Sequence, residues 1–155
     1  MSDFWISFIP EEPSYILNNQ TIDSIKKLSW YKDNVAIFVK DNIQFVDAGT
    51  NFKKVSCPFC NFDLINWWGN AMNEAYSDED GFINLDIVTP CCHKNSSLHC
   101  LDYDFPQGFY TSIIEMRPFY YQGVLQIHQE IFKDTICQEL FELTNETWRI
   151  VYTHI

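Results

Sequence analysis

Two pairs of cysteines are the residues of this chain best suited to chemistry. Cys57 and Cys60 enclose Pro58 in a Cys-Pro-Phe-Cys sequence, and Cys91 and Cys92 follow after 30 intervening residues. A Cys-x-x-Cys turn folds around a metal ion, and its backbone N–H groups stabilise the charge of the thiolates. Because a tetrahedral site needs four ligands, the sequence predicts one structural zinc ion held by these four cysteines.

The fourth zinc ligand is the least constrained member of this set. Aligning the two turns on their prolines puts Thr89 where the first cysteine of a second Cys-x-x-Cys turn would stand. We expect Cys91 to complete the site, with His93 and Cys100 as the alternatives. Four protein ligands leave no position for water or substrate, so the predicted site is structural and not catalytic.

Thiol redox chemistry is the main alternative for these cysteines. A redox Cys-x-x-Cys sits at the start of a helix, and Cys60 does precede a predicted helix. The second cysteine pair favours metal binding instead. Elsewhere, Ser96 and Ser97 have histidines nearby but lack a nucleophile elbow, and the five glycines are isolated, so no phosphate-binding loop is expected. The sequence therefore predicts no catalytic residues and a protein that is not an enzyme.

The elements that must position the cysteines mix strand and helix patterns. The clearest is a helix over 64–75, where apolar residues recur at i, i+3, i+4 and i+7. Two further helices are predicted at 22–31 and 124–143, and strands at 4–9, 35–39, 43–46, 82–88, 98–103, 109–116 and 147–152, with 35–46 forming a hairpin. This mixture predicts a single α+β domain over 1–155, with a mainly antiparallel sheet, two longer helices and an inserted zinc-knuckle element at about 55–100.

Composition and charge limit the environment and the partners of the chain. Its 155 residues are 46 % hydrophobic, enough for one core, and include neither an apolar run long enough to cross a bilayer nor a signal peptide. We therefore expect a cytoplasmic protein with no membrane partner. The formal net charge of −11 repels phosphate backbones, which argues against nucleic acid and for a basic protein as the partner.

Candidate partner-binding residues form two acidic groups and one aromatic group. Three aromatic rings follow a proline in a predicted turn, where they cannot all be buried, and exposed aromatic residues are typical of protein-binding patches. The acidic groups would supply the attraction to a basic partner. The candidate residues are Glu11, Glu12, Asp78, Glu79, Asp80, Phe119, Tyr120 and Tyr121.

The segment from Cys57 to Pro118 resembles a family of small bacterial proteins in four sequence features. These are the Cys-Pro-Phe-Cys turn, the pair Trp67-Trp68 followed by Ala71-Met72, the strand end from Phe82 to Cys92, and the stretch from Ser97-Leu98 to Gly108-Phe109. Such proteins are similar to immunity proteins, which neutralise secreted toxins in competition between bacteria. The resemblance implies a non-catalytic protein that binds and neutralises a cognate toxin.

The leading hypothesis from the sequence is thus an immunity protein that occupies the active site of a basic toxin. A nuclease toxin is basic because it holds phosphates, so electrostatic steering would bring an acidic inhibitor to it. One alternative is a thiol oxidoreductase or other enzyme that uses the cysteine cluster. The other is a zinc-ribbon-like adaptor within a larger assembly.

Overall fold

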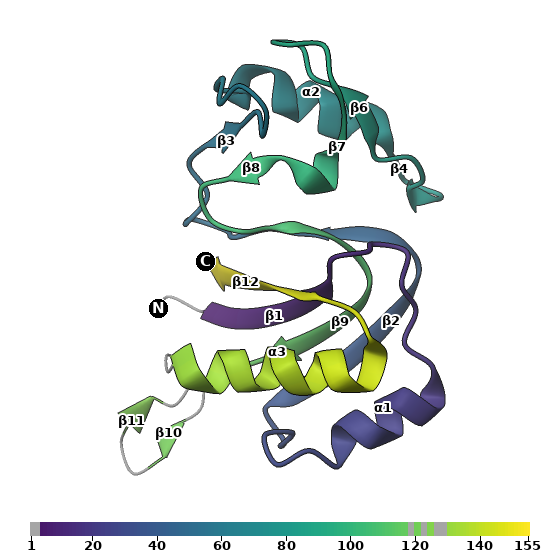
Figure 1. The fold of residues 1–155 in the computed structure, drawn as a ribbon, viewed down its shortest axis with the longest axis vertical. Helices are drawn as coiled ribbons and strands as arrows, with labels where there is room; N and C mark the ends of the chain where they lie inside the picture. Colours follow the sequence, from purple (N-terminus) through teal and green to yellow (C-terminus); the bar gives the residue numbers. More distant parts are fainter. Residues whose placement is uncertain (1–3, 118–119, 122–123, 126–129) are drawn as a thin grey trace.

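The computed structural model describes residues 4–117, 120–121, 124–125 and 130–155. Figure 1 shows an arrangement along the long axis of the molecule, with a coiled sheet in the middle. Helices α1 (Asn19–Lys26) and α3 (Glu130–Thr144) lie at one end, and α2 (Ile65–Ala75) lies with several short strands at the other. Of the helices in the described residues, none has the length and apolar character needed to cross a bilayer.

The central sheet has six strands in the order β12-β1-β9-β2-β5-β4, and each neighbouring pair is antiparallel. Its members are β1 (Phe4–Pro10), β2 (Val35–Val46), β4 (Tyr76–Ser77), β5 (Gly81–Phe82), β9 (Gly108–Met116) and β12 (Trp148–His154). Four short strands, paired as two two-stranded sheets, and a 3₁₀ turn complete the inserted unit between β2 and β9. They are β3 (Val55–Ser56) with β8 (Asp102–Tyr103), β6 (Asp86–Val88) with β7 (Asn95–Ser97), and η1 (Leu98–Cys100). The predicted α+β class with a mainly antiparallel sheet is confirmed.

Alternating side chains along β1 and β9 supply the core between the sheet and the helices. Ile6 and Phe8 of β1 and Ile114 of β9 are fully buried, and Ile136 and Leu140 of α3 pack against the same cluster. Burial of each such apolar side chain away from water stabilises the folded state by roughly 1.5–3 kcal/mol. This burial fixes the strand register, because a shift by one residue would turn the apolar side chains to the opposite face.

The sheet coils so far that the chain after β2 returns to the edge of β12. The N–H of Thr50 donates to the carbonyl of His154 at 2.7 Å, and the N–H of His154 donates to the carbonyl of Ala48. Gly49 makes this approach possible: its φ is +62°, and a Cβ there would lie 2.1 Å from the His154 carbonyl oxygen. Ile113 of β9 and Val151 of β12 belong to a second, smaller cluster of buried residues, separate from the core that includes α3.

Two predicted elements of the central sheet have different forms in the structure. The hairpin predicted over 35–46 is wrong, because β2 is a single strand that pairs with β9 along most of its length. The pairing of β2 with β9 shifts register between Val39 and Gln44, and this irregularity accommodates the turn-like residues Lys40, Asp41 and Asn42 within the strand. The strand predicted over 82–88 divides into β5 and β6, because the side chain of Asn84 accepts the N–H of Asp86 in a local turn.

Three further boundaries also differ from the predictions. The strand predicted over 98–103 is mostly the 3₁₀ turn η1, since the hydroxyl of Ser97 accepts the N–H of His99 and starts a helical turn. The helix predicted over 124–143 begins at Glu130, and its first residues instead form β11 (Val124–Leu125), paired with β10 (Tyr120–Tyr121). Helix α1 begins earlier than predicted, because Asn18 caps it by accepting the N–H of Thr21. The strands predicted at 4–9, 109–116 and 147–152 and the helix at 64–75 are confirmed.

The inserted unit is joined to the sheet by a polar contact around Arg149. The guanidinium of Arg149 on β12 forms a two-bond ion pair with Glu11 and also donates to the carbonyls of His99 and Gln107. The Nδ1 of His99 accepts the N–H of Phe109 at 3.0 Å, so its ring proton lies on Nε2, which faces the Glu11 carboxylate at 3.6 Å. One turn of the inserted unit is thus bound to two strands of the sheet.

Gly108 allows this close contact between the two parts of the molecule. A Cβ at this position would lie 2.7 Å from the Cε1 of His99 and 2.8 Å from the Nη1 of Arg149. Any side chain there would push η1 away from β12. The contact also affects the ionisation of Glu11. Burial would raise its pKa, but the nearby His99 ring, the hydrogen bonds from Arg149 and the charge of Arg149 lower the pKa from 4.5 to about 2.

The Glu11–Arg149 ion pair makes stability depend on pH. Because the folded-state pKa of Glu11 lies below 4.5, the pair stabilises the fold above about pH 4.5, and this contribution is lost as the pH falls toward 2. We expect Glu11→Gln to lower the free energy of unfolding at neutral pH by about 1 kcal/mol, since the carboxylate is 42 % exposed. The difference from the natural chain should shrink in acid, as measured by urea unfolding at several pH values.

The neighbouring Glu12 supplies a matched control. Among the residues that the structure describes, its carboxylate accepts hydrogen bonds only from the exposed Ser14. Glu12→Gln should therefore change the free energy of unfolding by less than about 0.5 kcal/mol at any of these pH values. Equal losses in the two variants would contradict the role assigned to the ion pair.

Candidate metal centre

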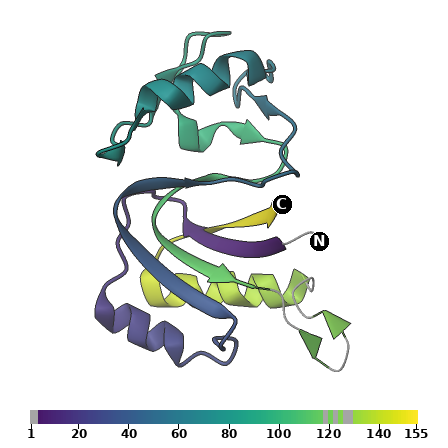
Figure 2. The ribbon, with the colours of Figure 1, turned by 180° about the vertical axis from the view of Figure 1, so that it is seen from behind.

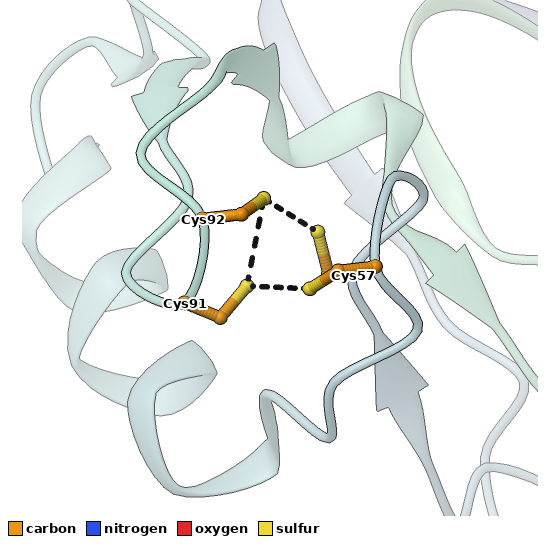
Figure 3. Close-up of side chains that lie close together, drawn as sticks. Cys57, Cys91 and Cys92 are labelled. Carbon is orange, nitrogen blue, oxygen red and sulfur yellow. Dashed lines mark hydrogen bonds between the residues drawn. The ribbon is translucent and has the colours of Figure 1, made fainter.

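Four cysteine sulfurs from two distant segments meet in the inserted unit. The Sγ atoms of Cys57, Cys60, Cys91 and Cys92 all lie within 4.8 Å of one another. The closest pairs are Cys60–Cys91 at 3.3 Å, Cys57–Cys92 at 3.6 Å and Cys91–Cys92 at 4.0 Å, and all four thiols are free. Figure 3 shows Cys57 approaching Cys91 and Cys92 from the opposite loop.

These distances fit a tetrahedral metal site. Four thiolates about 2.3 Å from a central ion stand about 3.8 Å apart, which falls inside the observed range of sulfur–sulfur distances. A disulfide would need about 2.05 Å, much shorter than any of these contacts. The cluster is therefore able to hold one metal ion with four sulfur ligands.

The first turn of the site is formed by residues 57–61. The N–H of Asn61 donates to the carbonyl of Cys57 at 2.9 Å, and the N–H of Phe59 points at the Cys57 sulfur at 3.4 Å. Asn61 has a φ of 64°, a left-handed conformation that asparagine tolerates better than most residues. The turn therefore closes sharply after Cys60 and leaves both sulfurs on its inner side.

The second turn, residues 89–93, repeats this geometry. The N–H of His93 donates to the carbonyl of Thr89 at 2.9 Å, and His93 has a φ of 58°. His93 therefore occupies the left-handed position that corresponds to Asn61. Its role in the structure is to end the turn, and both His93 and Cys100 lie outside the group of four sulfurs.

Thr89 stands at the place of the missing cysteine and contacts the site through its hydroxyl. The hydroxyl accepts the N–H of Lys94 at 2.9 Å and lies 3.2 Å from the sulfur of Cys92. Thr89 is fully buried. The hydroxyl can thus donate a hydrogen bond to the Cys92 thiolate, while Cys91, two residues further on, supplies the fourth sulfur.

The electrostatics of the cluster favour a bound cation. Burial would raise the pKa of Cys57, but hydrogen bonds from the N–H groups of Cys60 and Phe59 and from nearby thiols lower it to about 6. The pKa of Cys91 rises to about 12 through burial, its contacts with the other thiols and the negative charge of Cys57. Without a cation, the site therefore favours ionisation of the Cys57 thiol and opposes ionisation of the Cys91 thiol. A divalent ion would stabilise all four thiolates.

The local structure does not favour the redox alternative. Helix α2 begins at Ile65, so the Cys57–Cys60 turn does not open it, and the helix end is served instead by Asp63, which accepts the N–H of Ile65 at 3.0 Å. Cys57 is only 1 % exposed. A redox Cys-x-x-Cys needs a thiolate that lies at a helix N-terminus and is open to its substrate.

The predicted partner-binding residues lie at separate places on the molecule. Glu11 is engaged with Arg149, and Glu12 is exposed beside it. Residues 78–80 form the exposed turn between β4 and β5. Tyr120 and Tyr121 belong to β10, at the opposite end of the molecule from β4, and Phe119 lies outside the described residues (Figure 1).

No protein-family model, no curated protein sequence and no solved structure matches this chain. The chemistry of the site therefore follows from its own geometry. Four sulfur ligands suit a thiophilic ion such as zinc or iron, and they leave no open position at which a water or substrate could bind. A site of this kind stabilises a fold.

Loss of one sulfur tests the ligand set. We expect Cys91→Ser to reduce the bound transition metal well below one equivalent, measured by mass spectrometry of all metals in the purified protein, and to lower the Tm by roughly 5–10 °C. Cys100→Ser is the matched control, because Cys100 is exposed and outside the cluster. A Cys100 variant that loses metal, or a Cys91 variant that keeps it, would show that the ligands are assigned incorrectly.

The Thr89 hydroxyl offers a second and finer test. Thr89→Val removes the hydrogen bond to the Cys92 sulfur at nearly constant volume, and we expect a loss in metal affinity of about tenfold. Competition with a chromophoric chelator measures this affinity. Thr89→Ser keeps the hydroxyl and should bind metal as the natural chain does; equal affinities in all three proteins would remove Thr89 from the site.

Proposed function

We propose that this chain is a non-catalytic binding protein whose inserted unit is completed by one structural zinc ion. The observation that carries the proposal is the meeting of four sulfur atoms within 4.8 Å of one another. Zinc is the ion of choice because it is redox-inert and forms closed tetrahedral sites with four cysteines. Its ligands would be Cys57, Cys60, Cys91 and Cys92.

The size of the inserted unit supports a structural role for the zinc ion. Its helix and short strands share a small core around Leu64 and Leu98, with Cys57 as part of that core. Small units with limited apolar burial commonly depend on a metal or on disulfides. A zinc ion would join the turn before α2 to the turn after β6 and so add cross-links that the core does not supply.

The strongly acidic chain supports a basic protein as the partner. A formal charge of −11 at neutral pH attracts a basic surface over about one Debye length and raises the rate of association. Within this proposal, the specific function is that of a cytoplasmic immunity protein that neutralises a cognate toxin, such as a nuclease. The protein acts by occupying the toxin and not by chemical conversion.

The proposed partner can be tested with the product of the gene adjacent to that of this protein, which we expect to be the toxin. We expect the zinc-loaded protein to form a stable complex with it in size-exclusion chromatography at low salt and to abolish its activity. The association rate should fall by about tenfold between 20 and 200 mM salt, measured by stopped-flow fluorescence. No complex at low salt, with zinc present in full, would refute the toxin-binding function and leave the metal site untouched.

A further inference from the structure

Helix α2 and the chain segment 86–91 form the walls of two hollows in the inserted unit. One hollow, of about 400 Å³, lies between the start of α2 and the second metal turn, and its lining includes Phe62, Asp63 and Cys91. The other, of about 450 Å³, lies between the rest of α2 and β6 and includes Glu74 and Asp86. Figure 1 shows α2 running beside β6 and β7.

Trp67 lines both hollows and therefore connects them into one surface feature, which we name the α2 groove. The Trp67 side chain is half-buried, so one part of the ring stays accessible. At the two ends of the groove, Phe62 is 61 % exposed and Val88 is 55 % exposed. Large apolar side chains that remain open beside a concave surface are typical of anchor sites in protein recognition.

The charged side chains that line the α2 groove are all acidic. They are Asp63 at one end and Glu74 and Asp86 at the other, and the lining includes no lysine or arginine. In the part of the chain that the structure describes, no ion pair neutralises these three carboxylates. A segment that enters the groove thus meets a tryptophan ring between negative charges.

The other charged residues of the inserted unit add to the negative electrostatic potential at the groove. Between Val55 and Tyr103 the sequence has seven acidic residues and a single basic one, Lys94. The ammonium of Lys94 stands 5.2 Å from the ring centre of Phe59, on the turns that hold the sulfurs. The acidic residues of the unit are Asp63, Glu74, Asp78, Glu79, Asp80, Asp86 and Asp102.

We propose that the α2 groove binds a cationic segment of the partner protein that carries a large apolar side chain. The apolar side chain packs on Trp67, and lysine or arginine residues on either side of it pair with Asp63, Glu74 and Asp86. The Trp67 ring can make apolar contact with the large side chain and a cation–π contact with a neighbouring lysine or arginine. This inference rests on the proposed function, because it names the surface by which the protein would hold its basic partner.

The groove also depends on the metal site, since Cys91 and Pro90 form part of its wall. If the two metal turns separate, the wall beside Phe62 moves with them. Binding of the segment is therefore expected only in the zinc-loaded protein.

A labelled synthetic peptide tests the groove without knowledge of the partner. The probe is a short peptide with two phenylalanines set between lysines and arginines, and its binding to the zinc-loaded protein is followed by fluorescence anisotropy at about 50 mM salt. We expect saturable binding that is lost when serine replaces the phenylalanines or glutamate replaces the basic residues. In the protein, the double variant Glu74→Lys and Asp86→Lys should raise the Kd about tenfold.

The matched control changes the net charge equally at the far end of the molecule. Asp23 and Asp33 are exposed, in α1 and in the turn after it. The double variant Asp23→Lys and Asp33→Lys should leave the peptide Kd within about twofold of the natural value.

Equal losses in the two double variants would show attraction by net charge alone and would overturn the groove assignment. The absence of peptide binding would overturn it as well. Zinc content and the complex with the toxin are measured on the same proteins, so a failure of the proposed function is distinguished from a failure of the groove.

Discussion

The structure depends on one constraint: four thiol groups from two distant turns must stay within 4.8 Å of one another. Left as thiolates, four such groups would repel each other strongly, and the opposed pKa shifts of Cys57 and Cys91 express this conflict. A divalent cation would turn the repulsion into attraction and fix the distance between the turns. It would thereby also hold α2 in position, because the first turn leads into the helix and Pro90 and Cys91 of the second line a hollow beside it.

The rest of the fold holds this unit in place. The insertion leaves the sheet at the end of β2 and returns at the start of β9, two paired strands, so its ends are fixed side by side. Near the return point, the carbonyl of His99 in η1 accepts a hydrogen bond from the guanidinium of Arg149 in β12, and Gly108 permits the contact. A movement of the two cysteine turns would therefore be transmitted to the sheet through these contacts. A partner bound in the α2 groove would contact the same inserted unit.

Much of this arrangement could be predicted from the sequence, for physical reasons that differ between elements. The 3.6-residue period of α2 and the apolar strands β1, β9 and β12 follow from local pattern, and the cysteine spacing gave the four sulfurs that the structure brings together. Local pattern failed where tertiary pairing decides: β2 runs through the turn-like residues 40–42 because β9 offers a long partner. It also failed at η1 and at Asn84, where single side-chain hydrogen bonds redirect the backbone. The alignment of the two turns placed Thr89 at the position of a missing cysteine. The contact of its hydroxyl with the Cys92 sulfur could not be predicted from the sequence, because it depends on the three-dimensional path of the turn.

The proposed inserted unit requires one zinc ion bound by four sulfurs from these two turns. X-ray absorption at the zinc edge of the purified protein measures the number and kind of ligands directly. We expect a single shell of four sulfur atoms at about 2.3 Å, with one zinc per chain. A protein without zinc, or a shell in which nitrogen or oxygen replaces one or more sulfurs, would contradict it.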